Sequence, residues 1–342
     1  MKNFYVHVIG CQQNEHDGTR INYLLEKLRF ISTKIEDADL VIVVACSVRQ
    51  TAVDRIYGLI KNNSNKKIIA TGCVLDHDKK KLKDRNVDFW DIEKPEDLAK
   101  LLGIKNKGKI ADLLDEGTKF SSSVPIMFGC NNFCTYCATA FTRGRERSRE
   151  MSEVVKDVKS LIDKGVKEIL LLGQTINSYK DPATGARLDE LLIKLNDLDG
   201  NFIISFTSNH PKDMTDEIIE AVATLEKIKK EIHLPIQSGS DKILKAMNRP
   251  YTVKQYLNIV RKLKSKIKGL TLTTDVIVGF PGESEGDFNE TVKIFKFVKF
   301  DKAYINKYSP RPGTAAFRLG DPIPWSEKQR RWRILSELVD SR

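Results

Sequence analysis

The chain has 342 residues, of which 41% are hydrophobic and 30% are charged. At this length, the composition is typical of a water-soluble protein with two domains of ordinary size. It excludes a transmembrane protein, because every apolar run is much shorter than the ~20 residues that a membrane-spanning helix needs. The net charge of +11 favours a polyanionic partner such as a nucleic acid.

The N-terminus lacks the charged start, the long apolar stretch and the cleavage site of a signal peptide. We therefore expect a cytoplasmic protein that does not associate with membranes. In that reducing compartment, clustered cysteines bind metal or carry out chemistry more often than they form disulfides. The six cysteines are Cys11, Cys46, Cys73, Cys130, Cys134 and Cys137.

The first part of the chain alternates between strand and helix patterns. Strands are predicted at residues 4–10, 40–45 and 67–71, and helices at 18–28, 48–61 and 78–85. This alternation predicts an α/β domain over residues 1–103, with a parallel sheet between two helical layers. Residues 104–123 are polar and include a Ser-Ser-Ser run, so we expect a linker there.

The alternation then restarts. Six strands are predicted at residues 124–129, 168–173, 202–207, 231–236, 270–279 and 303–309, and the helices between them at 152–164, 188–195, 213–225, 251–267 and 286–298. Six β/α units are fewer than the eight of a closed TIM barrel, so we expect a partial (β/α)6 barrel over residues 124–320. Residues 321–342 are predicted to be a C-terminal helical segment.

The first cysteine set has one member after each strand of the first domain: Cys11, Cys46 and Cys73. The carboxyl ends of parallel strands share one sheet edge, where open α/β sheets bind ligands. Three thiolates there suit an iron–sulfur cluster that keeps one iron without a protein ligand. The alternative is that each cysteine is a small apolar residue that packs at the end of a buried strand.

The second cysteine set lies directly after the first barrel strand, at the carboxyl face where barrel active sites are built. Cys130, Cys134 and Cys137 have the spacing C-x3-C-x2-C, which can bind three irons of a [4Fe–4S] cube. A structural zinc site would need four protein ligands, and no fourth cysteine or nearby histidine is present. The spacing resembles the signature of the radical S-adenosylmethionine (SAM) superfamily. In that superfamily SAM binds the open iron and is cleaved to methionine and a 5′-deoxyadenosyl radical.

The order of the two cysteine sets is similar to that of the methylthiotransferase family of radical SAM enzymes. Eight motifs carry the resemblance: residues 10–15 (GCQQNE), 45–49 (ACSVR), 71–73 (TGC), 142–149 (TRGRERSR), 172–179 (LGQTINSY), 233–240 (HLPIQSGS), 278–283 (VGFPGE) and 308–314 (YSPRPGT). The motif at 172–179 resembles the MiaB-type branch, which acts on isopentenyladenosine in tRNA. Members of the family continue into a small RNA-binding β-barrel, the TRAM domain, and we expect this chain to lack it because it ends at residue 342.

The resemblance implies a transferase that adds a methylthio group to C2 of N6-isopentenyladenosine at position 37 of tRNA, next to the anticodon. It implies that Cys11, Cys46 and Cys73 hold an auxiliary [4Fe–4S] cluster that carries the sulfur. The cluster on Cys130, Cys134 and Cys137 would then generate the radical. Two SAM molecules would serve, one as methyl donor and one as radical source. An electron donor such as flavodoxin or ferredoxin and a sulfur or iron–sulfur delivery system are the further partners.

The remaining candidate site residues lie on the same carboxyl face of the barrel. For SAM we expect contacts from Gly173, Gln174, Gln237, Ser238, Gly279 and Phe280. For RNA phosphates we expect the alternating arginines Arg143, Arg145, Arg147 and Arg149, because arginine pairs bidentately with phosphate. The simpler alternative for the glycines among the SAM contacts is that they only turn the chain around Pro281. The simpler alternative for the arginines is that they pair with Glu146 or Glu150.

Other functions remain open at this point. The same chemistry could act on threonylcarbamoyladenosine in tRNA or on an aspartate of a ribosomal protein. A two-cluster electron carrier is the non-enzymatic alternative, although carriers normally ligate every iron with a cysteine of their own. A zinc-stabilised RNA-binding module is a third.

Overall fold

The computed structural model describes residues 2–47, 50–104, 108–118 and 121–340. These residues form two compact units: residues 1–124 with 141–143, and residues 125–140 with 144–342. Some expectations fall partly outside the described residues: the first two residues of the helix expected at 48–61, residues 105–107 and 119–120 of the expected linker, and the last two residues of the C-terminal segment.

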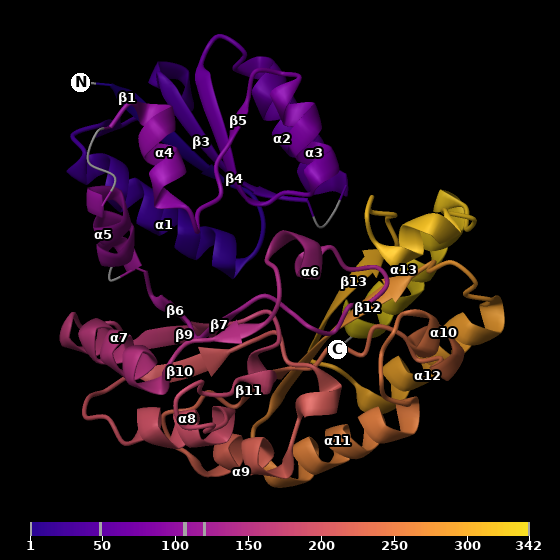
Figure 1. The fold of residues 1–342 in the computed structure, drawn as a ribbon. Helices are drawn as coiled ribbons and strands as arrows, with labels where there is room; N and C mark the ends of the chain where they lie inside the picture. The colour runs from indigo at the N-terminus through magenta and orange to yellow at the C-terminus, as the bar shows by residue number, and fades with distance from the viewer. Residues whose placement is uncertain (1, 48–49, 105–107, 119–120, 341–342) are drawn as a thin grey trace. The chain divides into compact units, whose positions relative to one another are not determined.

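The first unit contains a five-stranded parallel sheet in the order β2-β1-β3-β4-β5 (Figure 1). Its strands are β1 (Asn3–Val8), β2 (Ile31–Ser32), β3 (Leu40–Cys46), β4 (Lys67–Cys73) and β5 (Asp88–Phe89). Its helices are α1 (Gln12–Lys27), α2 (Gln50–Asn62), α3 (Asp76–Lys83), α4 (Pro95–Leu102) and α5 (Gly108–Gly117).

Strand β3 shows why this sheet is covered on both faces. Its side chains alternate between two apolar cores, because successive residues of a strand point to opposite sides. Ile42 and Val44 belong to the core that also contains residues of α1, α4 and α5. Val41 and Val43 belong to the core that contains residues of α2 and α3. The predicted three-layer arrangement is therefore confirmed.

The stretch expected to be a linker differs from that expectation. It contains helix α5, and Ile110 and Leu114 of this helix are buried in the core of the first unit. Gly117 lies so close to α1 that an added Cβ would stand 2.8 Å from the Cα of Arg20. Ile110 and Leu114 are four residues apart and thus on one helical face, a signal that the polar composition of the segment conceals.

The second unit follows a β/α alternation. Two three-stranded sheets have the orders β10-β9-β6 and β11-β12-β13 (Figure 1). The strands are β6 (Ser123–Pro125), where the chain passes from the first unit into the second, β9 (Glu168–Leu172), β10 (Ile203–Phe206), β11 (Glu231–His233), β12 (Thr271–Val278) and β13 (Lys302–Lys307). A parallel bridge between Ile204 and Ile228 joins β10 to the run that leads into β11. Six strands in chain order confirm the predicted partial barrel.

Helices cover the outside of these strands. They are α7 (Met151–Asp163), α8 (Leu188–Asn196), α9 (Asp216–Thr224), α10 (Asp241–Ala246), α11 (Val253–Lys266), α12 (Glu285–Val298) and α13 (Trp325–Asp340). The structure divides the first expected strand of the barrel into two short strands, β6 and β7 (Met127–Phe128). Strand β7 pairs in antiparallel fashion with β8 (Arg147–Ser148).

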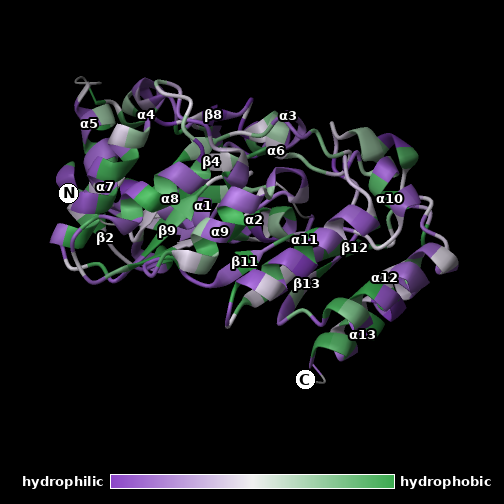
Figure 2. Ribbon diagram, turned by 90° about the horizontal axis from the view of Figure 1, so that it is seen from below, coloured by the Kyte–Doolittle hydropathy of each residue, from purple (hydrophilic) through white to green (hydrophobic). Residues whose placement is uncertain are grey.

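The helices of the second unit are amphipathic. Helix α11 buries Tyr256, Val260 and Leu263 and has hydrophilic residues between them, a mixture that is visible along α11, α12 and α13 in Figure 2. This pattern suits helices that pack one face against a sheet and leave the other in water. None of the helices among the described residues combines the length and the apolar character that crossing a membrane requires.

Candidate functional site

The cysteines of the first set meet at one edge of the five-stranded sheet. Cys11 directly precedes α1, and Cys46 and Cys73 are the last residues of β3 and β4. Cys46 and Cys73 are partners in the strand register. The order β2-β1-β3-β4-β5 reverses direction between β1 and β3, which is the place where open α/β sheets bind ligands.

Asn14 ties two of the cysteine loops together. Its buried Nδ2 donates to the carbonyl of Ile9 at 2.7 Å and to the carbonyl of Ala45 at 3.0 Å. Gly10 permits this approach: its φ is +144°, and an added Cβ would stand 2.6 Å from the Nδ2 of Asn14 and 3.1 Å from the Cβ of Cys46. The carbonyl of Ile9, two residues before Cys11, and the end of β3 are thereby joined through one side chain.

Arg143 is part of the first unit, and its guanidinium lies among the residues of the first cysteine set. Its Nε donates to the Sγ of Cys73 at 2.8 Å, and its Nη2 donates to the Oδ1 of Asn14 at 2.9 Å and to the Oδ2 of Asp17 at 3.1 Å. The side chain is only 9% exposed. This placement differs from the RNA contact expected for Arg143, because its Nε and Nη2 donate to partners inside the protein.

Burial shapes the electrostatics of this group. It raises the pKa of the Cys73 thiol, an effect that the nearby charge of Arg143 opposes. Burial also disfavours the charged form of Arg143, but Cys73 and Asp17 outweigh it, so the pKa of this guanidinium lies above its ordinary value. Arg143 is therefore a permanent cation beside a cysteine sulfur.

The second cysteine set lies on the loop after β7, and each of its three sulfurs has a polar partner. Asn132 donates to the Sγ of Cys130 at 3.4 Å from both its backbone N and its Nδ2. The backbone N of Thr139 lies 3.4 Å from the Sγ of Cys137. The Nη1 of Arg249 donates to the Sγ of Cys134 at 3.4 Å. Such hydrogen bonds orient metal-binding side chains and tune the bound group.

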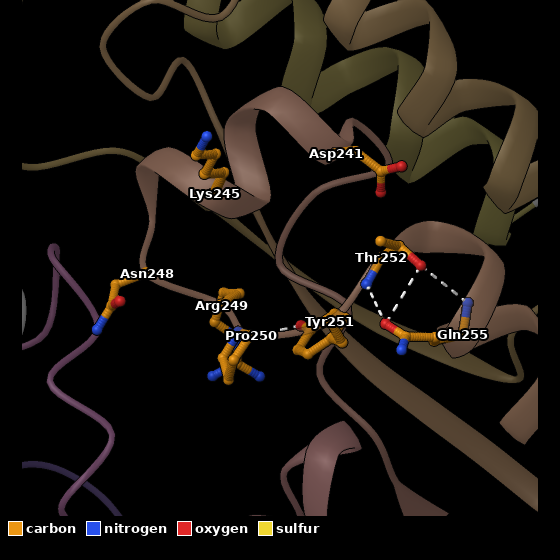
Figure 3. A pocket seen from close by; sticks show the side chains of 8 residues that line it. All are labelled: Asp241, Lys245, Asn248, Arg249, Pro250, Tyr251, Thr252 and Gln255. Atoms are coloured by element: carbon orange, nitrogen blue, oxygen red, sulfur yellow. Dashed lines mark hydrogen bonds between the residues drawn. The ribbon is translucent and has the colours of Figure 1, made fainter.

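Asn248 and Arg249 support this loop from the segment between α10 and α11. The Nδ2 of Asn248 donates to the carbonyls of Asn132 and Phe133, both at 3.1 Å. Both residues line a pocket of about 450 Å³ (Figure 3). The other lining residues are Asp241, Lys245, Pro250, Tyr251, Thr252 and Gln255. The carbonyl contacts allow Phe133 to adopt its left-handed conformation, with a φ of +48°.

The chemistry of both sets fits a [4Fe–4S] cluster with one open iron, since each offers three thiols and no fourth cysteine. Burial raises the pKa of Cys137 to about 11, so a bound metal must supply the stabilisation that its thiolate needs. Among the described residues, no three His, Cys, Asp or Glu side chains lie close enough together to hold one metal ion.

The residues expected to contact SAM lie at strand ends, but their surroundings differ. Gly173 and Gln174 follow β9. The Oε1 of Gln174 is buried and has no hydrogen-bond partner in the part of the chain that the structure describes. An added Cβ on Gly173 would stand 2.6 Å from the Cγ of Met127, so packing against β7 already accounts for this glycine. Gln174 thus offers an acceptor that a bound ligand can use.

The other expected SAM residues are more deeply embedded. Gln237 has a φ of +67° and bridges to Val276 of β12, and Ser238 is 1% exposed. Gly279 and Phe280 follow β12, and the Phe280 ring is fully buried against Tyr308, with ring centroids 5.3 Å apart. Phe280 therefore fills a core, and its backbone is the part that remains for a ligand.

The other three arginines also differ from one another. Arg145 and Arg147 are exposed and lie over the rings of Phe133 and Phe128, at 4.4 and 5.3 Å from the ring centroids. Arg149 instead donates to the carbonyl of Pro125 at 2.9 Å and to Asp157 at 2.8 Å. Arg149 thus stabilises the start of the barrel through contacts inside the protein. This role differs from the RNA contact that we expected for it.

Sequence reasoning missed the polar residues that touch the cysteine sulfurs. These are Arg143 in its actual role, Asn132, Thr139, Thr175 and Arg249. Asn132 and Thr139 lie two residues from a cysteine, so their proximity in the chain was an available signal. Arg249 lies 115 positions from Cys134, and only the fold brings them together.

Comparisons with known proteins agree with this geometry. Residues 124–295 match the radical SAM superfamily, and residues 3–90 match an uncharacterized protein family, UPF0004. The chain is 39% identical to the tRNA-2-methylthio-N(6)-dimethylallyladenosine synthase of Clostridium botulinum, over 98% of this chain and 81% of the relative. The enzyme of the same name from Carboxydothermus hydrogenoformans is 38% identical, over 98% and 83%.

Solved structures share the fold at low sequence identity. The cobalamin-dependent SAM radical enzyme OxsB superposes with a TM-score of 0.60 at 12% identity, over 98% of this chain and 56% of that chain. The radical SAM methyltransferase TsrM from Kitasatospora setae has a TM-score of 0.60 at 12% identity, over 92% and 77%.

The superfamily match covers half of the chain, and relatives at 38–39% identity cover nearly all of it. The family predicted from the motifs is thereby confirmed. The chain belongs to the radical SAM superfamily and, within it, to the family of tRNA-2-methylthio-N(6)-dimethylallyladenosine synthases, which are transferases.

Proposed function

We propose that this chain transfers a methylthio group to C2 of N6-isopentenyladenosine (also called dimethylallyladenosine) at position 37 of tRNA. The relatives that cover the chain are named for this product. The observation that carries the proposal is the presence of two cysteine triads, each within one unit: the first gathers at one edge of the five-stranded sheet, and the second lies on the loop after β7. One triad would suffice for an enzyme that only cleaves SAM.

The two triads have different tasks in this proposal. Cys11, Cys46 and Cys73 would hold an auxiliary [4Fe–4S] cluster, and Cys130, Cys134 and Cys137 a second one that binds SAM. When bound, these groups supply the sulfur, the methyl group and the radical that the reaction needs. The protein holds the cysteine sulfurs in place: Asn132 and Thr139 donate to them from backbone nitrogens, and Arg249 from a buried guanidinium.

The neighbouring residues would position SAM and RNA. Gln174 presents a buried acceptor without a partner among the described residues, which suits a donor group of SAM. Gly173, Gln237, Ser238, Gly279 and the backbone of Phe280 would surround it. Exposed Arg145 and Arg147 would pair with RNA phosphates, and the rings beneath them would support stacking on an unpaired base.

The proposed reaction determines which partners the enzyme needs. The substrate is tRNA, so we place the enzyme in the cytoplasm. An electron donor such as flavodoxin or ferredoxin would reduce the SAM-binding cluster, and a sulfur or iron–sulfur delivery system would restore the auxiliary cluster. The basic charge of the chain favours the polyanionic substrate.

The test is an anaerobic reconstitution followed by an assay. The protein is loaded with iron and sulfide, and the irons are counted; we expect about eight per chain. Dithionite, SAM and tRNA that contains isopentenyladenosine are then added, and the nucleosides are analysed by mass spectrometry. Methylthio-isopentenyladenosine is the expected product. Full iron content with SAM cleavage and no such product would contradict the assigned substrate, and threonylcarbamoyladenosine tRNA and ribosomal protein would be tested next.

Two matched variants separate the tasks of the triads. Cys11→Ala/Cys46→Ala/Cys73→Ala should keep about half of the irons and should still cleave SAM, but should form no methylthio product. Cys130→Ala/Cys134→Ala/Cys137→Ala should also keep about half of the irons and should lose SAM cleavage. Methylthio product from the first variant would contradict the division of tasks.

A further inference from the structure

We infer that Arg143 is a positioning residue of the auxiliary site. Arg143 holds the Sγ of Cys73 and raises the reduction potential of the cluster bound there. The inference rests on the proposed function, in which Cys11, Cys46 and Cys73 bind that cluster. The sequence suggested a different role for Arg143, the binding of RNA phosphate, which the burial of its guanidinium contradicts.

The contacts of Arg143 use the planar geometry of a guanidinium. The Nε donates to the Sγ of Cys73 at 2.8 Å, and the Nη2 donates to both Asn14 and Asp17. The Asn14 and Asp17 partners are themselves buried, at 0% and 1% exposure. A lysine in this place has one nitrogen and cannot reach all three partners in the same way. The arrangement therefore fixes the direction from which Cys73 receives its hydrogen bond.

The same network reaches the loops of all three cysteines. Asn14, which accepts from Arg143, donates to the carbonyl of Ile9 before Cys11 and to the carbonyl of Ala45 before Cys46. The third loop is reached directly, through the Sγ of Cys73. Arg143 thus joins three separate loops to one buried cation, which is the arrangement expected of a residue that pre-organises a ligand set.

A cation beside the sulfur affects the charge balance of a bound cluster. Reduction adds one electron, and a hydrogen-bonded guanidinium stabilises the more negative, reduced form. The effect is strong where water is excluded, because the interior screens charge weakly. Asp17 partly offsets the charge of Arg143, and Arg20 pairs with the same carboxylate at 3.7 Å. Arg20 also pairs with the largely exposed Asp115 at 3.7 Å, so the two guanidiniums and two carboxylates balance in charge. The member of this network that touches the sulfur is the cation, Arg143.

The position of Arg143 in the chain supports a role at this site. Residues 141–143 group with the first unit, whereas Ala140 and Gly144 on either side group with the second. The segment that follows the second cysteine set therefore supplies a group to the site of the first set.

The experiment uses the full chain with only the auxiliary cluster. Cys130→Ala/Cys134→Ala/Cys137→Ala is reconstituted, and its midpoint potential is measured by titration with dithionite under electron paramagnetic resonance. The test variant adds Asp17→Asn and Arg143→Gln together, so that no buried charge is left unpaired. We expect an unchanged iron content and a more negative midpoint potential than in the parent.

Two further variants distinguish positioning from folding. Arg143→Lys keeps the positive charge but loses the planar, multiple donors of the guanidinium. We expect its midpoint potential to lie between those of the parent and the double variant. Arg20→Gln removes a guanidinium that pairs with Asp17 but does not touch Cys73, and we expect a much smaller shift. An unchanged potential in the double variant at full iron content would overturn the inference, and so would unfolding of every Arg143 variant.

A separate control tests whether Cys73 is a ligand of the auxiliary cluster. Cys73→Ala in the same background should lose the auxiliary cluster. If its iron content and spectrum stay unchanged, Cys73 is not a ligand, and the proposed function fails at this site. If the cluster is lost in Cys73→Ala and the potential still does not move in the Arg143 variants, only the inference about Arg143 fails.

Discussion

The Nη1 of Arg249 donates to the Sγ of Cys134 at 3.4 Å, across 115 positions of the chain. Arg249 is 8% exposed and also donates from its Nε to the hydroxyl of Tyr251 at 3.0 Å. Burial disfavours its charge, but Tyr136, Tyr251 and Cys134 outweigh that effect and raise the pKa of the guanidinium above its ordinary value. A permanent cation therefore stands beside a cysteine of the second set.

Replacing Arg249 by glutamine should weaken the site that this cysteine builds. The change removes a hydrogen bond to a charged group, which is worth about 1.5–3 kcal/mol. We expect fewer irons in the second site and slower formation of 5′-deoxyadenosine from SAM. Arg261→Gln is the matched control, because Arg261 is exposed on α11 and donates to Asn258. Equal iron content and equal SAM cleavage in Arg249→Gln and the parent would contradict this role.

Gln174 should matter for SAM binding and not for stability. Its Oε1 is buried without a hydrogen-bond partner among the described residues, so the protein already bears the cost of burying it. Gln174→Ala removes this acceptor, and we expect about tenfold weaker SAM binding with an unchanged or slightly higher melting temperature. Equilibrium binding of SAM to the reconstituted protein measures the first effect. Gln50→Ala in the first unit is the control; a loss of stability without a loss of affinity would assign Gln174 to the core.

The fold was predictable where the pattern of apolar residues is regular. The continuous apolar run of β3 predicts a buried central strand, and the structure places it between two other strands. The short edge strands β2 and β5 have two residues each, too few for any periodic signal. Helix α5 was hidden by its polar composition, although Ile110 and Leu114 anchor it in the core.

The site was predictable to the extent that its chemistry depends on cysteine spacing. C-x3-C-x2-C lies within one loop, and Cys46 and Cys73 end neighbouring strands. The roles of Arg143 and Arg249 were not predictable, because each depends on a contact between residues that are 70 or more positions apart. A row of four arginines looks uniform in sequence. The fold turns Arg143 and Arg149 inward and leaves Arg145 and Arg147 exposed.

His210 should make the stability of the chain fall in acid. Burial, and then the charges of Arg249 and Lys212, lower the pKa of His210 from 6.5 to about 2. Above pH 6.5 this histidine is neutral in both states. Below it the unfolded chain binds a proton that the folded chain refuses, so the free energy of unfolding falls as the pH falls.

The change expected from this one group is about 1.4 kcal/mol between about pH 7.5 and about pH 5.5. Urea denaturation of the apo chain at both pH values measures it. His210→Asn, which can still accept from the backbone N of Lys212, should lose less stability over the same range than the parent. An equal loss in both proteins would show that His210 binds a proton in the folded state.

Gly129 and Gly144 offer a matched pair for the loop of the second cysteine set. Both have a left-handed backbone, with φ of +73° and +75°. An added Cβ on Gly129 would stand 2.1 Å from the carbonyl oxygen of Arg145, whereas an added Cβ on Gly144 meets nothing within 4 Å among the described residues. The carbonyl of Gly144 accepts from the backbone N of Cys130 at 3.1 Å, so the two glycines lie on facing segments, one just after β7 and the other just before β8.

The two alanine variants should therefore differ sharply. Gly144→Ala bears only the left-handed strain of about 1–2 kcal/mol and should keep its irons and its SAM cleavage. Gly129→Ala must also displace the backbone at Arg145, so the loop that carries Cys130 cannot keep its shape, and iron in the second site should be lost. Iron counts and thermal melting of the two variants measure the difference. If both variants lose iron equally, backbone strain alone controls this loop, and the close approach at Gly129 is not what holds Cys130 in place.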